Sequence, residues 1–183
     1  MTYFLVGTTD FSSQGILKPA LGTASKLTLQ IVFFCFLLGL AKAAWMPVHA
    51  WLPSAMVAPT PVSALLHAVA VVKAGVFGVA RISCHTFGVE LMQILGLGLV
   101  LAAIAAITII VANCLAIGQT NLKKMLAYST INQLALIILG VALLSPMALT
   151  GAILHIPFHG FMKITLFLCA GTIAAITGKK TIN

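Results

Sequence analysis

Six lysine and histidine side chains lie inside the long apolar stretches of this sequence, where an ionisable group is costly unless it has a partner or a function. They are Lys42, His67, Lys73, His155, His159 and Lys163. Histidine changes charge close to neutral pH, and a lysine taken out of water can release its proton in the same range. Groups of this kind can pass protons to one another, so the six residues are candidates for a proton relay.

The last three of these residues are regularly spaced. His155, His159 and Lys163 recur at every fourth position in HIPFHGFMK. On a helix they would form one stripe about 12 Å long that drifts by about 40° per step. Pro157 lies in the same segment and would free the carbonyl of Ile153. A ladder of titratable groups on one helix face favours proton transfer over a chance placement of polar residues.

The other three residues come earlier in the chain. Lys42 lies near the end of the apolar run IVFFCFLLGLAKAAWM and is followed by Pro47. It either extends to the membrane surface or meets water at a helix break, and the proline favours the break. His67 and Lys73 are six residues apart, about 120° around a helix and about 9 Å along it. Both can face a bundle interior, although His67 could instead be a hydrogen-bonded core histidine.

The composition indicates that a lipid bilayer surrounds these stretches. Of the 183 residues, 61% are hydrophobic and 7% are charged, whereas roughly a quarter of the residues in soluble domains are charged. The net charge of +8 does not indicate nucleic-acid binding, because the basic residues are scattered among apolar runs. The four cysteines stand alone without a Cys-x-x-Cys pair, which favours apolar filling over a metal site or a disulfide.

Five apolar stretches are long enough to span a hydrocarbon core, which takes about 20 helical residues. They cover residues 27–46 with a proline-rich extension to 58, then 62–80, 91–118, 125–144 and 148–177. We expect Pro47 and Pro53 to break the first helix and Pro157 to kink the fifth, while Ser145 and Pro146 separate the last two. The prediction is an all-α integral membrane protein with about five transmembrane helices.

The lysines between the stretches predict the orientation. With five spans the two ends lie on opposite sides, and the paired lysines 123–124 and 179–180 flank span ends. Positively charged loops stay in the cytoplasm, so we expect both pairs there, or in the organellar equivalent, and the N-terminus outside. Residues 1–26 would then be a loop outside the membrane, 27–177 the helical bundle and 178–183 a short cytoplasmic tail.

Four segments of this chain resemble the antiporter-like subunits shared by respiratory complex I (NADH:quinone oxidoreductase), Mrp-type sodium/proton antiporters and membrane-bound hydrogenases. GLAKAAWMPVHAWLPSAM (39–56) resembles the family's broken helix with its central lysine, and APTPVSALLHAVAVVKAG (58–75) resembles the helix that follows. LKKMLAYSTINQ (122–133) is similar to the start of the second repeat's hairpin, and HIPFHGFMKITLFLCAG (155–171) is similar to the relay helix.

The resemblance implies a role for each candidate. Lys42 would be the pumping lysine of the first half-channel, and the other five would form a hydrophilic axis joining two halves. The family fold has two inverted five-helix repeats, of which this chain would cover the end of one and the start of the next. The glutamate that pairs with the pumping lysine would precede Met1, and a second broken helix would follow Asn183. We therefore expect a truncated or split piece that does not complete a channel by itself.

The predicted function is proton translocation within a redox-driven pump such as NADH:quinone oxidoreductase, through the relay of lysines and histidines. The subunit would have no redox catalysis of its own and no cofactor or metal. Its partners would be other membrane subunits, in a bacterial or archaeal cell membrane or an organellar inner membrane. A subunit of a multi-subunit Na⁺/H⁺ antiporter is the alternative, and these residues do not separate the two.

A membrane electron-transfer protein is a more remote alternative. His67, His155 and His159 lie in helices, and two histidines on facing helices can ligate haem iron. The lysines interleaved with them would place cations beside the haem, which disfavours this reading.

Overall fold

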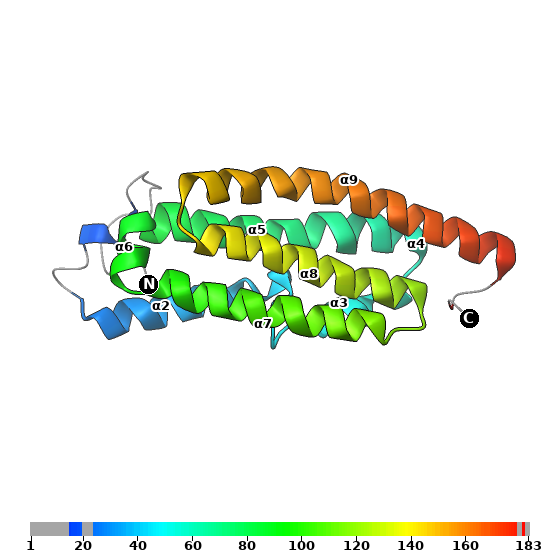
Figure 1. Ribbon diagram of the computed structural model, residues 1–183, viewed down its shortest axis with the longest axis horizontal. Coiled ribbons are helices and arrows are strands. Elements are labelled where there is room, and N and C mark those ends of the chain that lie inside the picture. Colours follow the sequence, from blue (N-terminus) through cyan, green and yellow to red (C-terminus); the bar gives the residue numbers. More distant parts are fainter. Residues whose placement is uncertain (1–14, 20–23, 179–180, 182–183) are drawn as a thin grey trace.

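The computed structural model describes residues 15–19, 24–178 and 181, and Figure 1 shows them as a bundle of helices that run side by side. Four helical segments are long and apolar enough to cross a membrane: Thr60–Phe87, Leu97–Ile117, Leu122–Ala142 and Pro146–Thr177. A shorter apolar helix, α2 (Lys26–Gly39), precedes them. The predicted fold class, an all-α membrane protein, is confirmed. Residues 1–14 and the lysines at 179 and 180 lie outside the described residues.

The first apolar stretch is broken, as predicted, but the break begins before either proline. Helix α2 ends at Gly39, and Ala44 adopts a left-handed conformation (φ 55°). The Met46–Pro47 peptide bond is cis. Between Gly39 and the next span the chain forms only short helical turns, named η2, α3 and η3 (Ala41–Ala43, Trp51–Ser54 and Ala55–Val57).

Neighbouring side chains satisfy the backbone of this irregular segment. The Met46 N–H donates to Thr108 Oγ1 at 3.1 Å, and the Trp51 indole N–H donates to the Ala41 carbonyl at 3.2 Å. Thr108 is fully buried within α7 (Leu97–Ile117). At membrane depth a free backbone group costs several kcal/mol, so irregular chain survives only where protein or water pairs with it. The buried threonine is therefore part of what permits the break.

The second span is one continuous helical segment with two wider portions. Its four parts are α4 (Thr60–Val62), η4 (Ser63–Val71), α5 (Val72–Arg81) and η5 (Ile82–Phe87). Of these, η4 and η5 are π-helical. It extends beyond the predicted range of 62–80 at both ends. π-helical turns are rare and are often found at functional sites. His67 lies in η4 and Lys73 in α5.

The third predicted stretch, 91–118, is divided in two. Helix α6 (Val89–Ile94) and α7 are separated by Gly96, whose φ of +67° is a conformation that favours glycine. Helix α8 (Leu122–Ala142) then begins at Asn121, whose side-chain oxygen accepts the N–H groups of Lys123 and Lys124 at 3.0 and 3.3 Å. This cap fixes the start of α8.

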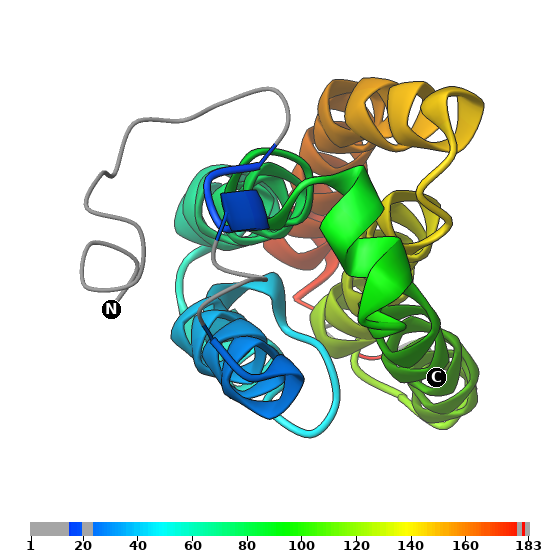
Figure 2. The same ribbon diagram turned by 90° about the vertical axis from the view of Figure 1, so that its left-hand side faces the viewer.

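Helices α8 and α9 (Pro146–Thr177) form an antiparallel hairpin. Pro146 occupies the first turn of α9, where a missing N–H is tolerated, so the predicted separation of the last two helices is confirmed. Pro157 lies inside α9, and Figure 1 shows the helix bending part-way along its length. In the end-on view of Figure 2, α9 and α2 lie on opposite sides of the bundle. Helix α9 also contacts α5 and α8, and α5 and α9 carry four of the candidate residues, Lys73, His155, His159 and Lys163.

The backbone of η2 packs directly against Gly75 of α5. A Cβ atom at Gly75 would lie 2.7 Å from the Lys42 carbonyl carbon and 2.8 Å from Ala43 Cα. Because backbone rather than a flexible side chain is in the way, Gly75→Ala should lower the unfolding free energy by about 1–3 kcal/mol. The measurement is the midpoint of thermal unfolding in detergent.

The matched control is Gly151→Ala in α9, where a Cβ would meet nothing within 4 Å. That change should be neutral or stabilise the helix by up to about 1 kcal/mol. Equal unfolding midpoints for the two variants would contradict the backbone contact between α5 and η2.

Candidate functional site

Lys73 and His159 are in direct contact in the interior of the bundle. Lys73 Nζ is hydrogen-bonded to His159 Nδ1, which joins α5 to α9. The two residues are only 8% and 1% exposed. When Lys73 is protonated its ammonium can only donate, so in that state Nδ1 accepts this bond and the ring proton is on Nε2. His159 Nε2 is buried and has no hydrogen-bond partner among the described residues.

His155 extends this contact toward α8. Its ring is stacked on that of His159, with centroids 5.8 Å apart and planes 7° from parallel. His155 Nε2 lies 2.8 Å from Gln133 Oε1. An amide oxygen accepts, so His155 carries its proton on Nε2 and its Nδ1 is available as an acceptor. Gln133, His155, His159 and Lys73 therefore form a connected line across three helices.

Lys163 is the most deeply buried charge of the site. It is 0% exposed, and its ammonium donates to Ser129 Oγ at 2.9 Å and to the Leu126 carbonyl at 3.3 Å. Both acceptors belong to α8. The charges of Lys73 and Lys163 repel each other, which makes a doubly protonated pair costly at this depth.

No carboxylate accompanies these cations in the part of the chain that is described. The acid within it is Glu90, which pairs with Lys18 at 2.5 Å on the exposed surface. The buried groups are instead stabilised by neutral oxygens and by imidazole.

The remaining two candidates lie apart from this line. His67 is half-buried in η4, and its Nδ1 is buried without a partner among the described residues. The Lys42 side chain is exposed, and it lies beside the break that the sequence predicted. It is exposed because the break starts at Leu40, which places Lys42 on the turn η2 rather than on a packed helix face.

Two residues of the site, Ser129 and Gln133, were not predicted from the sequence. They bond to Lys163 and His155 from the facing helix. The sequence held a signal for them, because the two are four residues apart on one helix, the same spacing as the stripe on α9. Their partners could not be assigned before the pairing of α8 with α9 was known.

The comparison with known proteins gives the family. The whole chain, residues 1–183, matches the family model described as NADH:quinone oxidoreductase/Mrp antiporter, TM. The chain belongs to this family. It is 37% identical over 174 residues to NADH-quinone oxidoreductase subunit L of Buchnera aphidicola, covering 94% of this chain and 27% of that protein. It is 43% identical over 153 residues to a subunit of a probable K⁺/H⁺ antiporter of Rhizobium meliloti, covering 83% of this chain and 15% of that protein.

Two solved structures of this antiporter-like family's fold are similar over nearly the whole chain. The Mrp complex from a Dietzia species gives a TM-score of 0.82 at 32% identity, covering 100% of this chain and 20% of the matched chain. An archaeal membrane-bound sulfane sulfur reductase gives 0.82 at 28% identity, covering 99% and 36%. The chain thus spans between 15% and 36% of the length of these four relatives.

The site of this antiporter-family chain offers little to a metal or haem. Among the described residues, no group of three or more His, Cys, Asp or Glu side chains could hold a metal ion. His155 and His159 stack on one helix, with one ring nitrogen of each engaged by Gln133 and Lys73. Histidines that ligate one haem iron axially lie on facing helices, whereas these two lie on the same helix.

Gln133 should set the tautomer of His155. Replacing it with leucine removes the acceptor of the Nε2 proton, a bond worth about 0.5–1.5 kcal/mol. The preference for the Nε2–H tautomer should therefore fall by about 2-fold to 10-fold, as measured from the ¹⁵N chemical shifts of histidine-labelled protein.

Gln119→Leu is the matched control, because Gln119 follows the end of α7 and its amide donates to the Leu115 carbonyl in the last turn of that helix. It should leave the histidine spectrum unchanged. An unaltered His155 tautomer in Gln133→Leu would show that the amide does not hold the ring.

Proposed function

We propose that this chain forms part of a proton-translocating, antiporter-like membrane subunit of a redox-driven pump of the NADH:quinone oxidoreductase type. The observation that carries the proposal is the line from half-buried Gln133 and His155 to buried His159 and Lys73, with buried Lys163 one helical turn from His159. Membership of the family and the likeness to subunit L support it. The partners are other membrane subunits of the same complex, and the redox chemistry belongs to them.

The first proton step takes place between Lys73 and His159. The Nζ–H bond of the ammonium breaks and a bond to Nδ1 of the imidazole forms, leaving a neutral amine and an imidazolium. The imidazolium then releases its Nε2 proton to water and becomes neutral again. His155 can accept that proton through the water at Nδ1, since Gln133 holds its other nitrogen in the protonated form.

Repulsion between the two lysines couples the steps. A proton that arrives on Lys163 disfavours the proton on Lys73, because both ammonium groups lie in a weakly screened interior. Loading one end of the line therefore promotes release from the other. Ser129 and the Leu126 carbonyl stabilise the charged form of Lys163 without neutralising it, so the repulsion is retained.

Lys42 and His67 complete the proposed set. By resemblance Lys42 is the pumping lysine, and its exposed side chain on η2 can pair with a carboxylate on another helix of the complex. His67 precedes Lys73 on the same span, and its unpaired Nδ1 can join the axis through water. Its place in a π-helical turn, which leaves the backbone adaptable, supports that role.

A subunit of a multi-subunit Na⁺/H⁺ antiporter is the second candidate. The specific observations that favour it are the 43% identity to part of a probable K⁺/H⁺ antiporter and the TM-score of 0.82 to an Mrp complex. The two functions use the same lysines and histidines. Proton transport that needs Na⁺ or K⁺ on the opposite side would decide for the antiporter.

Lys163→Arg should reduce proton pumping by the assembled complex at least 10-fold, nearly as much as Lys163→Ala. A guanidinium keeps the positive charge but does not release its proton near neutral pH. The measurement is proton uptake into vesicles during turnover. Lys18→Arg, a matched change at an exposed lysine paired with Glu90, should pump normally. Wild-type pumping by Lys163→Arg would make Lys163 a fixed charge rather than a relay member.

The proposed orientation places Lys123 and Lys124 in the cytoplasm, together with the lysines at 179 and 180. Lys124 is exposed at the start of α8, and Glu90 is exposed near the opposite end of α7. In a background without the four native cysteines, Lys124→Cys should react with an impermeant thiol reagent from the cytoplasmic side. Glu90→Cys should react from the other side. The reverse pattern would invert the proposed topology, including the loop at 1–26 and the tail at 178–183.

A further inference from the structure

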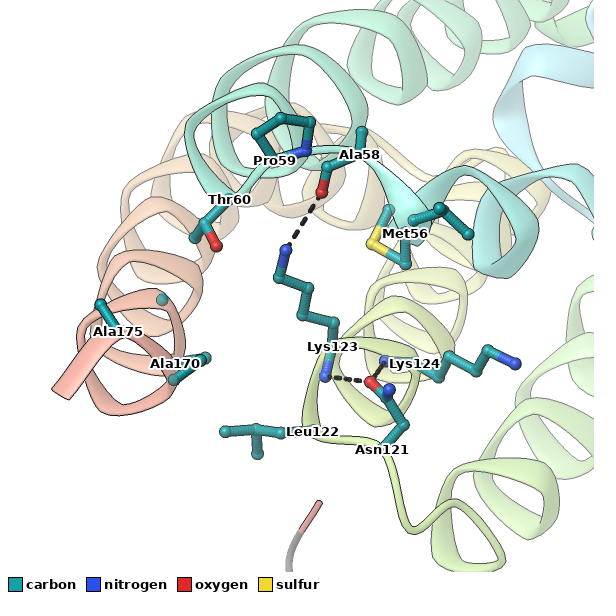
Figure 3. Close-up of a pocket in the computed structure, with 13 residues that line it drawn as sticks. Met56, Ala58, Pro59, Thr60, Asn121, Leu122, Lys123, Lys124, Ala170 and Ala175 are labelled. Atoms are coloured by element: carbon teal, nitrogen blue, oxygen red, sulfur yellow. Dashed lines mark hydrogen bonds between the residues drawn. The ribbon is translucent and has the colours of Figure 1, made fainter. Parts of the chain in front are cut away.

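A pocket of about 570 Å³ opens at the end of the bundle where α8 begins. Figure 3 shows it between the first turn of α8, the segment leading into α4 and the last turns of α9. Polar groups lie at its edge, because Asn121 and Lys124 belong to the capped start of α8. The Lys123 ammonium donates to the Ala58 carbonyl at 3.1 Å beside the pocket. These features place the pocket where the bundle meets water.

The pocket lies at the end of the same α8–α9 interface that holds Lys163. His155 meets Gln133 and Lys163 meets Ser129, and these two contacts fix the register of the antiparallel hairpin. About two turns further along, the same register brings Leu122 close to Ala170. Both of these residues line the pocket. The floor of the pocket and the Lys163 ammonium therefore face the same seam between the two helices.

One apolar layer separates the pocket from Lys163. On α9, Lys163, Phe167, Ala170 and Ala174 lie within about 60° of one another, and Ala170 is about 10 Å along the axis from Lys163. Phe167 stands between them and is 0% exposed. Leu126, which is 7% exposed, occupies the corresponding level of α8. Polar groups are present above this layer and below it.

We propose that the pocket is the aqueous vestibule through which protons reach or leave Lys163, and that the Phe167 ring closes this route. This inference rests on the proposed relay, and it adds the place where Lys163 exchanges protons with water. Water does not form a hydrogen-bonded chain across a packed apolar layer, so the closed ring isolates the ammonium. Displacing the ring leaves room for about two waters, which would connect the pocket to Ser129 and Lys163.

Cysteine accessibility in the assembled complex tests this route independently of pumping. In a background without native cysteines, Ala170→Cys should react with a small charged methanethiosulfonate added on the Lys124 side. Ser129→Cys, which lies beyond the apolar layer, should react at least 10-fold more slowly. Adding Phe167→Ala should raise the rate at Ser129→Cys about 10-fold or more, because the reagent and water can then pass.

Two further variants control for disruption of the fold. Phe161→Ala removes the same ring from a position that is 72% exposed on α9, and it should leave the rate at Ser129→Cys unchanged. Phe167→Leu keeps an apolar side chain in the layer, so the route should stay closed. Equal acceleration by Phe161→Ala and Phe167→Ala would show general loosening and overturn the gate.

The outcome separates this inference from the proposed function. If Ala170→Cys does not react from the Lys124 side, or if Phe167→Ala does not accelerate labelling of Ser129→Cys, the vestibule is wrong. The relay would still stand if Lys163→Arg abolishes pumping. Conversely, the cysteines could react as expected while Lys163→Arg pumps normally. The water-filled entrance would then stand, and the proposed relay would be wrong.

Discussion

A buried ammonium must find oxygen ligands, and the hydrogen bonds of Lys163 to α8 are the interaction on which the site depends. Ser129 Oγ and the Leu126 carbonyl supply those ligands. The contact also fixes the register of the α8–α9 hairpin, which then places His155 beside Gln133. Once α9 is held in this register, His159 faces α5 and meets Lys73. One solvation requirement thus organises three helices.

The same requirement explains the broken first stretch. Backbone groups released over residues 40–50 need partners at membrane depth, and a buried hydroxyl of α7 and the indole of Trp51 provide them. The absence of a side chain at Gly75 lets η2 approach the backbone of α5. A helix that stays unbroken would need none of these arrangements, so the break is supported by residues on two other helices. It leaves Lys42 on the outer surface, where other parts of a larger assembly can reach it.

Neutral ligands around positive charges give the site its chemical character. A carboxylate beside Lys73 or Lys163 would hold the proton and weaken the repulsion between the two lysines. Imidazole, amide and hydroxyl groups lower the cost of burial without trapping the charge.

The sequence by itself determined the helical membrane fold, the family and four of the residues that the structure brings together. Apolar length and the fourfold spacing on α9 are local properties, and local sequence is enough to reveal them. The partners were decided by tertiary structure, because Ser129 and Gln133 gain their roles only when α8 pairs with α9 in one register. The exposure of Lys42 and the division at Gly96 were also decided there. Both depend on backbone turns whose hydrogen bonds and packing come from residues distant in the chain, and no local pattern records where those residues will lie.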